Sequence, residues 1–196
     1  MLKLYHAPRS TSARILWLLE ELRDSGPVDI EVVRVRDPYT AGGAADPANP
    51  HPHGFTPALL HDGQLISETG AVALYLTDLF PQSPVGVAVG DPQRGAYLSW
   101  VFYQVGLTEP LVYMKAKKTL DADPAMRTLD AAMMKHIEHR LADEGPYLLG
   151  ARFTAADILM MSLFEQARPL LGDSVVIDAY LKLADRPARR RAQAID

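Results

Sequence analysis

The first 35 residues alternate between the patterns of a buried strand and an amphipathic helix. Residues 2–5 form a short apolar run before Pro8, which favours a strand. Residues 28–35 are rich in Val and Ile and predict a second strand. A strand–helix–strand unit of this length calls for parallel strands joined by a right-handed crossover. The segment between them repeats apolar residues on one helical face: Ile15, Leu18, Leu19 and Leu22.

Residues 36–80 extend this unit with a loop, a hairpin and a helix. Residues 36–55 contain four prolines and a Gly-Gly pair, and so predict a long loop. Residues 57–61 and 64–66 flank Asp62-Gly63, a strong signal for a two-residue hairpin. Residues 67–80 have helical spacing and end before Pro81. The predicted order is therefore β-α-β, loop, β-β-α.

The pattern changes after residue 80. Residues 81–92 hold three Pro and two Gly without a helical period, so we expect a linker there. Helices are predicted over residues 93–118 with a kink at Pro110, from Asp123-Pro124 onward, and over residues 178–193. A further helix begins at Thr154 and Asp157, which have the spacing of a capping box. The sequence thus predicts an α/β domain over 1–80, a linker over 81–92 and an all-helical domain over 93–196. The helix that begins at Asp123-Pro124 has its expected apolar face at Leu129, Met133, Ile137 and Leu141.

Composition excludes several classes of protein. The 196 residues carry a net charge of −4, which argues against binding dominated by nucleic-acid phosphates. The chain has no cysteine, so a disulfide, a Cys-ligated metal and a Cys nucleophile are excluded. No apolar run approaches a membrane span, and the first ten residues lack the core of a signal peptide. We expect a soluble cytoplasmic protein, whose thiol chemistry would need a thiol brought by a ligand.

Three short segments are candidates for a site. Ser10, Thr11 and Ser12 lie at the start of the first helix, where unpaired N–H groups suit an anion. From spacing alone, a simple helix cap is the favoured role of Ser10 or Ser12. Thr56-Pro57 opens a strand, either as an ordinary strand-start proline or with a cis bond that turns Thr56 toward the first loop.

The third segment, Glu68-Thr69, lies at the start of the third helix. The Thr69 hydroxyl and the helix amides suit a carboxylate, and Glu68 suits an ammonium group. The alternative is that Glu68 only complements the helix dipole. His51-Pro52-His53 lacks a third ligand at convincing spacing, so we expect no metal site.

Together these segments resemble the glutathione transferase family. The matching stretches are LYHAPRSTSARILWLLEEL, GFTPALLHDG and ISETGAVALYL, followed by YLLGARFTAADI and AYLKLADRPARRRA in the helical half. They cover nearly the whole chain in order and at the right spacing. The resemblance implies a thioredoxin-like first domain and a helical second domain. The first loop is most similar to that of bacterial and serine-type members, which agrees with the absence of cysteine.

The resemblance also implies roles for individual residues. Ser10, four residues before Arg14, occupies the catalytic hydroxyl position and would donate a hydrogen bond to the glutathione thiolate. Thr56, before a cis Pro57, would pair with the cysteinyl part through its backbone. The γ-glutamyl end would be held by Glu68 and Thr69. The full set of expected glutathione-binding residues is Arg9, Ser12, Phe55, Thr56, Pro57, Glu68 and Thr69.

Two points depart from the family pattern or stay open. Many members carry Lys where this chain has Phe55, so the usual partner of the glycyl carboxylate is missing, and Arg9, His51 and His53 are alternatives for it. Tyr5 is a rival for the catalytic hydroxyl, because tyrosine-type members carry theirs near the end of the first strand. The expected lining on the second-substrate side is Tyr5, Tyr103, Leu107 and Tyr113.

The expected function is transfer of glutathione, as a thiolate, to a small electrophile or a peroxide. Glutathione is the expected cosubstrate, without a metal, and the expected assembly is a homodimer that binds neither nucleic acid nor membrane. Detoxification is the expected physiological role. A non-catalytic interaction module of the same fold is the alternative that Phe55 favours. A glutathione-dependent isomerase is a further alternative, although its usual Ser-Ser-Cys run is absent.

Overall fold

The computed structural model describes residues 1–196, except for the side chain of Thr40. It divides into two compact units, residues 1–86 with 186–196 and residues 87–185. The domains predicted from the sequence differ from these units at the end of the chain. The last eleven residues, expected in the helical domain, pack with the first unit instead. The division into domains at residues 80 and 93 stays a proposal.

The first unit is built on a four-stranded mixed sheet in the order β2-β1-β3-β4. Strands β1 (Leu2–His6) and β2 (Ile30–Arg34) are parallel, as predicted for the strand–helix–strand unit. Strands β3 (Ala58–His61) and β4 (Gln64–Ser67) form the predicted antiparallel hairpin. Both turn residues, Asp62 and Gly63, have positive φ (48° and 83°), which is the geometry that favours Asp-Gly in such turns.

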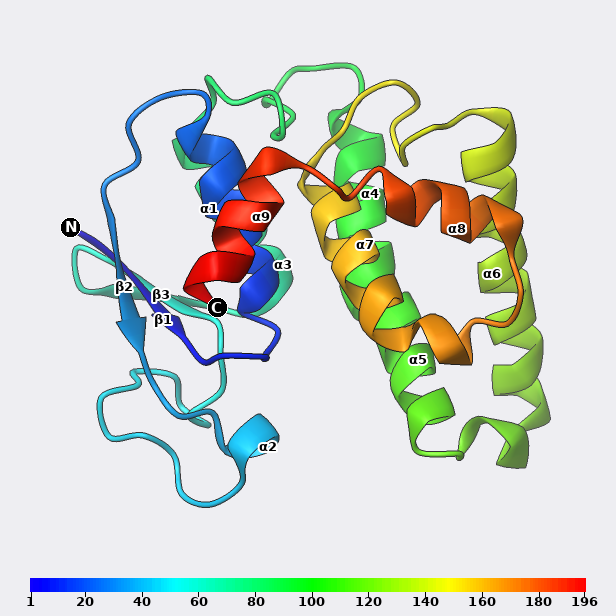
Figure 1. Ribbon diagram of the computed structural model, residues 1–196, viewed down its shortest axis with the longest axis horizontal. Coiled ribbons are helices and arrows are strands. Elements are labelled where there is room, and N and C mark those ends of the chain that lie inside the picture. The colour runs from blue at the N-terminus through cyan, green and yellow to red at the C-terminus, as the bar shows by residue number, and fades with distance from the viewer. The chain divides into compact units, whose positions relative to one another are not determined.

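Three helices pack together beside this sheet (Figure 1): α1 (Ala13–Arg23), α3 (Thr69–Leu79) and α9 (Pro187–Ile195). The predicted apolar face of α1 is buried. Glu20 and Glu21 are buried as well, although their positions predict solvent exposure, because α9 covers that side of α1. A short helix, α2 (Pro38–Ala41), interrupts the segment predicted as one long loop.

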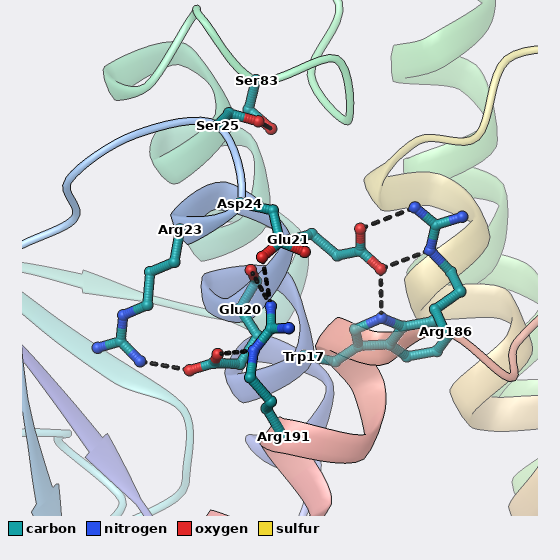
Figure 2. Close-up of polar contacts among 9 residues, drawn as sticks. All are labelled: Trp17, Glu20, Glu21, Arg23, Asp24, Ser25, Ser83, Arg186 and Arg191. Atoms are coloured by element: carbon teal, nitrogen blue, oxygen red, sulfur yellow. Dashed lines mark hydrogen bonds and ion pairs between the residues drawn. The ribbon is translucent and has the colours of Figure 1, made fainter.

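Figure 2 shows how arginines of the last segment hold α1. Arg186 contacts Glu21 through Nε and Nη2, at 2.6 and 2.9 Å from the two carboxylate oxygens. The indole Nε1 of Trp17 donates to the same carboxylate at 2.9 Å. Arg191 bonds Glu20 at 2.8 Å and Asp24 at 2.6 Å. Of the arginines at 189–191, Arg191 thus pairs with acids on α1, and its side chain stays 43% exposed.

The second unit is helical. Helix α4 (Arg94–Tyr103) continues through a π-helical turn, η1 (Gln104–Thr108), into α5 (Glu109–Ala116). After a short 3₁₀ turn, η2 (Leu120–Ala122), α6 runs over Pro124–Asp143. Helix α7 (Ala155–Ala167), a second 3₁₀ turn, η3 (Arg168–Leu170), and α8 (Val175–Lys182) complete the unit. Among the described residues, none of these helices combines the length and apolarity that crossing a membrane requires.

The starts of α6 and α7 lie where the sequence predicts them, whereas the predicted last helix is divided. Asp123 caps α6 by accepting from the amides of Ala125 and Met126. The helix predicted over 178–193 is in fact two helices, α8 and α9, which are separated at residues 183–186. Pro187 explains the break, because proline ends a helix unless it stands in the first turn, where α9 has it. On α6 Leu129 lies exposed, while the other three residues of its predicted face are buried.

Asp157 makes the predicted capping box with Thr154 at the start of α7. Its carboxylate also accepts from the Leu148 amide and the Tyr180 hydroxyl, each at 2.9 Å. Burial raises the pKa of Asp157 to about 6, against these hydrogen bonds, which lower it. One buried carboxylate thus joins the start of α7 both to α8 and to the loop that precedes α7.

Candidate functional site

A cluster of buried hydroxyl groups lies where the loop after β1 meets the segment before β3. Ser10 Oγ lies 2.6 Å from Ser12 Oγ and 2.8 Å from Thr56 Oγ1. Ser10 and Thr56 are 46 positions apart in the chain, and both are buried. The structure therefore brings together two of the three segments that the sequence selected.

Ser12 does not act as the side-chain cap that one reading of the sequence predicts. It occupies the N-cap position of α1, but its hydroxyl makes no capping bond to the amides of that helix. Its Oγ lies 2.8 Å from Nδ1 of His6, and the Ser12 amide donates to Ser10 Oγ at 3.2 Å. The hydroxyls of this loop are therefore tied to the end of β1 and to each other.

His6 is a residue of this cluster that the sequence analysis missed. The inward alternation of β1 over Leu2, Leu4 and His6 was a readable signal, because the third member of that face is polar. His6 is fully buried, and burial lowers the pKa of its imidazole, while Asp196 raises it and Arg34 lowers it. Its Nε2 lies 3.3 Å from Asp196 Oδ1, although without hydrogen-bond geometry.

Asp37 is the second residue that was missed. Its Oδ2 accepts from the Thr56 hydroxyl at 2.7 Å and from the Thr56 amide at 2.8 Å. Its Oδ1 accepts from the Tyr39 amide at the start of α2. Asp37-Pro38 is the same helix-start pattern as Asp123-Pro124, so the signal was present within the predicted loop.

The backbone of Thr56 is engaged on both sides. Its amide donates to Asp37, and its carbonyl accepts from Thr11 Oγ1 at 2.7 Å. The bond between Thr56 and Pro57 is cis, as the family resemblance implies. A carbonyl oxygen has a second lone pair, so Thr56 O keeps the capacity to accept from a ligand.

Glu68 and Thr69 open α3, and Glu68 adopts a rare backbone conformation. It has φ 71° and ψ 128°, a region that costs a non-glycine residue about 1–3 kcal/mol. Its side chain is 82% exposed, and its Oε1 lies 4.0 Å from His51 Nε2. The first amides of α3 have no partner within the helix, and the side chain of the N-cap residue, Glu68, does not cap them. An exposed acid and a helix N-terminus thus lie together.

Phe55 belongs to a cluster of rings on the surface of the first unit. It is 43% exposed. The rings of His51 and His53 lie 5.7 and 5.8 Å from it, and that of Tyr39 lies 6.3 Å away at an edge. Of the three alternatives to the missing Lys, two therefore lie beside Phe55. The third, Arg9, has its amide directed at Asp196.

The remaining predicted residues are Tyr5 on β1 and three residues of the second unit. Tyr5 alternates with His6 along β1, so it lies on the opposite face of the sheet with Lys3. Tyr103, Leu107 and Tyr113 belong to the second unit. There the Tyr103 ring packs edge-on against Trp100, and Tyr113 is exposed with Lys117 above its ring. Within the part of the chain that the structure describes, no group of three or more His, Asp or Glu is placed to hold a metal.

Comparisons with known proteins agree with the fold and with the resemblance. No protein-family model matches the chain. The chain is 27% identical to glutathione S-transferase GstA of Escherichia coli O157:H7 over 177 residues, which cover 85% of this chain and 82% of that protein. A glutathione transferase structure from Methylococcus capsulatus (strain Bath) superposes with a TM-score of 0.78 at 27% identity, and the match covers 100% of this chain and 98% of that one.

A glutathione S-transferase structure from Actinobacillus pleuropneumoniae superposes with a TM-score of 0.80 at 22% identity, a level that speaks for the fold alone. Its match covers 100% of this chain and 92% of that one. The likenesses extend over both units, which agrees with a thioredoxin-like first unit followed by a helical second unit. On sequence and fold together, the chain is similar to glutathione transferases over most of its length.

Proposed function

We propose that this protein binds glutathione at the hydroxyl cluster of the first unit and activates its thiol for attack on a small electrophile or a peroxide. The observation that carries the proposal is the 2.8 Å contact between Ser10 and Thr56. It joins the residue proposed to donate to the thiolate with the residue proposed to hold the cysteinyl backbone.

The size of the effect is sufficient for this role. A free thiol has a pKa near ~8.5, so only a few per cent is ionised at neutral pH. A hydrogen bond to a charged group contributes roughly 1.5–3 kcal/mol, and a helix N-terminus roughly 0.3–1 kcal/mol. At about 1.4 kcal/mol per unit, these two contributions lower the thiol pKa by roughly one to three units. Ser10 need not act as a base, because donation to the sulfur anion is enough.

A bound sulfur anion would accept the hydrogen bond that Ser10 Oγ otherwise donates to Thr56. Ser10 Oγ already receives the Ser12 amide, and it contacts two other hydroxyls. Its side chain is only 3% exposed, so the ligand must displace one of these contacts. We propose that Thr56 Oγ1 gives way, because it retains its hydrogen bond to Asp37.

The peptide ends of glutathione have complementary partners in the same unit. The cysteinyl N–H is proposed to donate to the second lone pair of Thr56 O, since the Thr56 amide is held by Asp37. The γ-glutamyl carboxylate suits the first amides of α3 and the Thr69 hydroxyl. Its ammonium group suits the exposed Glu68 carboxylate. His53, exposed beside Phe55, is proposed to receive the glycyl carboxylate.

The test is replacement of Ser10 by Ala. We expect the pKa of the bound thiol, followed by thiolate absorbance against pH, to rise by at least about one unit. Turnover of an aryl halide near neutral pH should fall about tenfold or more, because less thiolate is present. Ser25→Ala is a matched control, since it removes a hydroxyl that bonds Ser83 in the same unit. An unchanged thiol pKa in the Ser10 variant would remove Ser10 from this role.

A non-catalytic interaction module is the second candidate, and Phe55 is the observation that favours it. This exposed ring replaces the charged residue that many members carry, and it lies among the rings of Tyr39, His51 and His53. Calorimetry with glutathione separates the two functions. Binding in the micromolar to millimolar range supports the enzyme, whereas no heat at millimolar glutathione supports the module.

The wider setting is also proposed. We infer a homodimer, a cytoplasmic location and a role in detoxification, with Tyr103, Leu107 and Tyr113 as candidates for contact with the second substrate. Light scattering tests the dimer, and a monomer at micromolar concentration would contradict it. Substitution of each candidate by Ala tests substrate contact, through a change in KM for the electrophile without a change in KM for glutathione.

A further inference from the structure

An unbroken series of hydrogen-bonding contacts joins His6 to Asp37 through three hydroxyl groups. His6 Nδ1 lies 2.8 Å from Ser12 Oγ, which lies 2.6 Å from Ser10 Oγ. Ser10 Oγ lies 2.8 Å from Thr56 Oγ1, which donates to Asp37 Oδ2 at 2.7 Å. All five side chains are buried. We name this series the hydroxyl chain.

Counting protons gives the hydroxyl chain a direction. A carboxylate only accepts, so the single proton of Thr56 points to Asp37. Thr56 Oγ1 can then only accept from Ser10. Because the Ser10 proton is used in this way, Ser12 must supply the proton between Ser12 and Ser10.

The remaining contact, between His6 and Ser12, needs a proton from His6. Because the Ser12 proton is directed to Ser10, Ser12 Oγ must accept from Nδ1–H of His6. The four contacts need four protons, and the three hydroxyls supply three. The competing acceptor for Ser12, the Ala7 carbonyl, lies farther away at 3.3 Å. If His6 lacked a proton on Nδ1, one contact of 2.6–2.8 Å would have no proton between its atoms.

The two nitrogens of His6 face different groups. The Asp196 carboxylate, 3.3 Å from Nε2 and without hydrogen-bond geometry, favours a proton there through its charge alone. The contact of 2.8 Å with Ser12 requires a proton on Nδ1. Burial lowers the pKa of His6, and Arg34 lowers it further, whereas Asp196 raises it. A neutral imidazole protonated on Nδ1 satisfies the hydroxyl chain without a buried charge.

We propose that His6 and Asp37 are positioning residues that direct the Ser10 proton away from Ser12, so that it is always available to a bound sulfur anion. This inference rests on the proposed function. Without the donor on His6, Ser12 Oγ has a free lone pair for Ser10, and its own proton can turn to the Ala7 carbonyl at 3.3 Å. Ser10 then donates to Ser12, and its proton is no longer available to the ligand.

The first test needs no ligand. Nitrogen-15 NMR of the imidazoles in the full chain distinguishes Nδ1–H from Nε2–H, and His6→Asn assigns the His6 signals. We expect Nδ1 to be protonated. A His6 ring protonated on Nε2 alone overturns the proposal, whether or not the protein binds glutathione.

The second test compares two substitutions of His6 in the glutathione complex. His6→Asn keeps an N–H near the position of Nδ1, whereas His6→Leu removes the donor, and both lose the contact with Asp196. We expect the thiol pKa to stay near the wild-type value in the Asn variant. In the Leu variant it should rise by about one unit, which is about tenfold less thiolate near neutral pH. Equal pKa values in the two variants would show a merely structural role.

Ser12→Ala and Asp37→Ala complete the design. Ser12→Ala removes the hydroxyl that competes for the Ser10 proton, so the thiol pKa should stay near the wild-type value, and His6→Leu should add little in its presence. Asp37→Ala removes the acceptor of the Thr56 proton, so Thr56 can donate to Ser10, and the thiol pKa should rise. A rise of about one unit on adding His6→Leu to Ser12→Ala overturns the proposal. If the wild type binds no glutathione, the proposed function fails, and the NMR measurement still decides the direction of the hydroxyl chain.

Discussion

Replacing Glu21 by Gln should loosen the last segment of the chain from α1. The Glu21 side chain is 4% exposed and accepts three hydrogen bonds, two from Arg186 and one from Trp17. Removing one partner of a fully buried ion pair costs about 3–5 kcal/mol. The Arg186 side chain is 32% exposed, so water partly compensates it, and Gln keeps one oxygen as an acceptor. We therefore expect a loss of about 2–4 kcal/mol in the free energy of unfolding.

Urea unfolding followed by tryptophan fluorescence measures this change, because Trp17 itself contacts Glu21. The matched control is Arg23→Ala, which removes one partner of Glu20, while Arg191 keeps that acid paired. The control should cost about 0–1 kcal/mol. The double variant with Arg186→Gln should lose less than the sum of the two single variants. A Glu21→Gln protein within about 0.5 kcal/mol of the wild type would refute the reasoning.

Three further changes have expected outcomes. Burial raises the pKa of Asp157 from 3.8 to about 6, so the folded state holds this proton more tightly, and the free energy of unfolding should fall by about 3 kcal/mol as the pH rises from about 4 to 7. Asp157→Asn should lack that part of the slope in urea titrations at each pH; an identical slope would contradict the assignment. Gly54→Ala would place a Cβ 2.3 Å from Ala45 Cβ at φ 70° and should lower the melting temperature more than Gly43→Ala, which has a similar φ and open space, so equal shifts would exclude the steric cause. Phe55→Lys should lower the Kd for glutathione severalfold in calorimetry, and it should not change the Kd for a glutathione analogue that lacks the glycyl carboxylate.

Local patterns were enough for most elements of the fold. The parallel pair β1 and β2, the hairpin at Asp62-Gly63 and the capping box at Thr154 and Asp157 follow from periodicity and turn chemistry that act within a few residues. The break between α8 and α9 was also readable from Pro187, and the prediction of one helix there was wrong. The π-helical turn η1 ends at Thr108, close to Pro110, where the sequence predicts a kink in the helix.

The sequence by itself determined which segments carry the candidate chemistry, because a strand followed by a Ser-rich helix start, a Thr-Pro and a Glu-Thr are local features. It did not determine that His6 and Asp37 join Ser10 and Thr56, nor that Glu20 and Glu21 lie buried beneath α9. Apart from the contact between His6 and Ser12, these contacts join residues far apart along the chain. The cost of burying a charge or a hydroxyl depends on whether a hydrogen-bond partner lies beside it. Only tertiary packing supplies that partner, so only the structure decides which polar groups become part of the site.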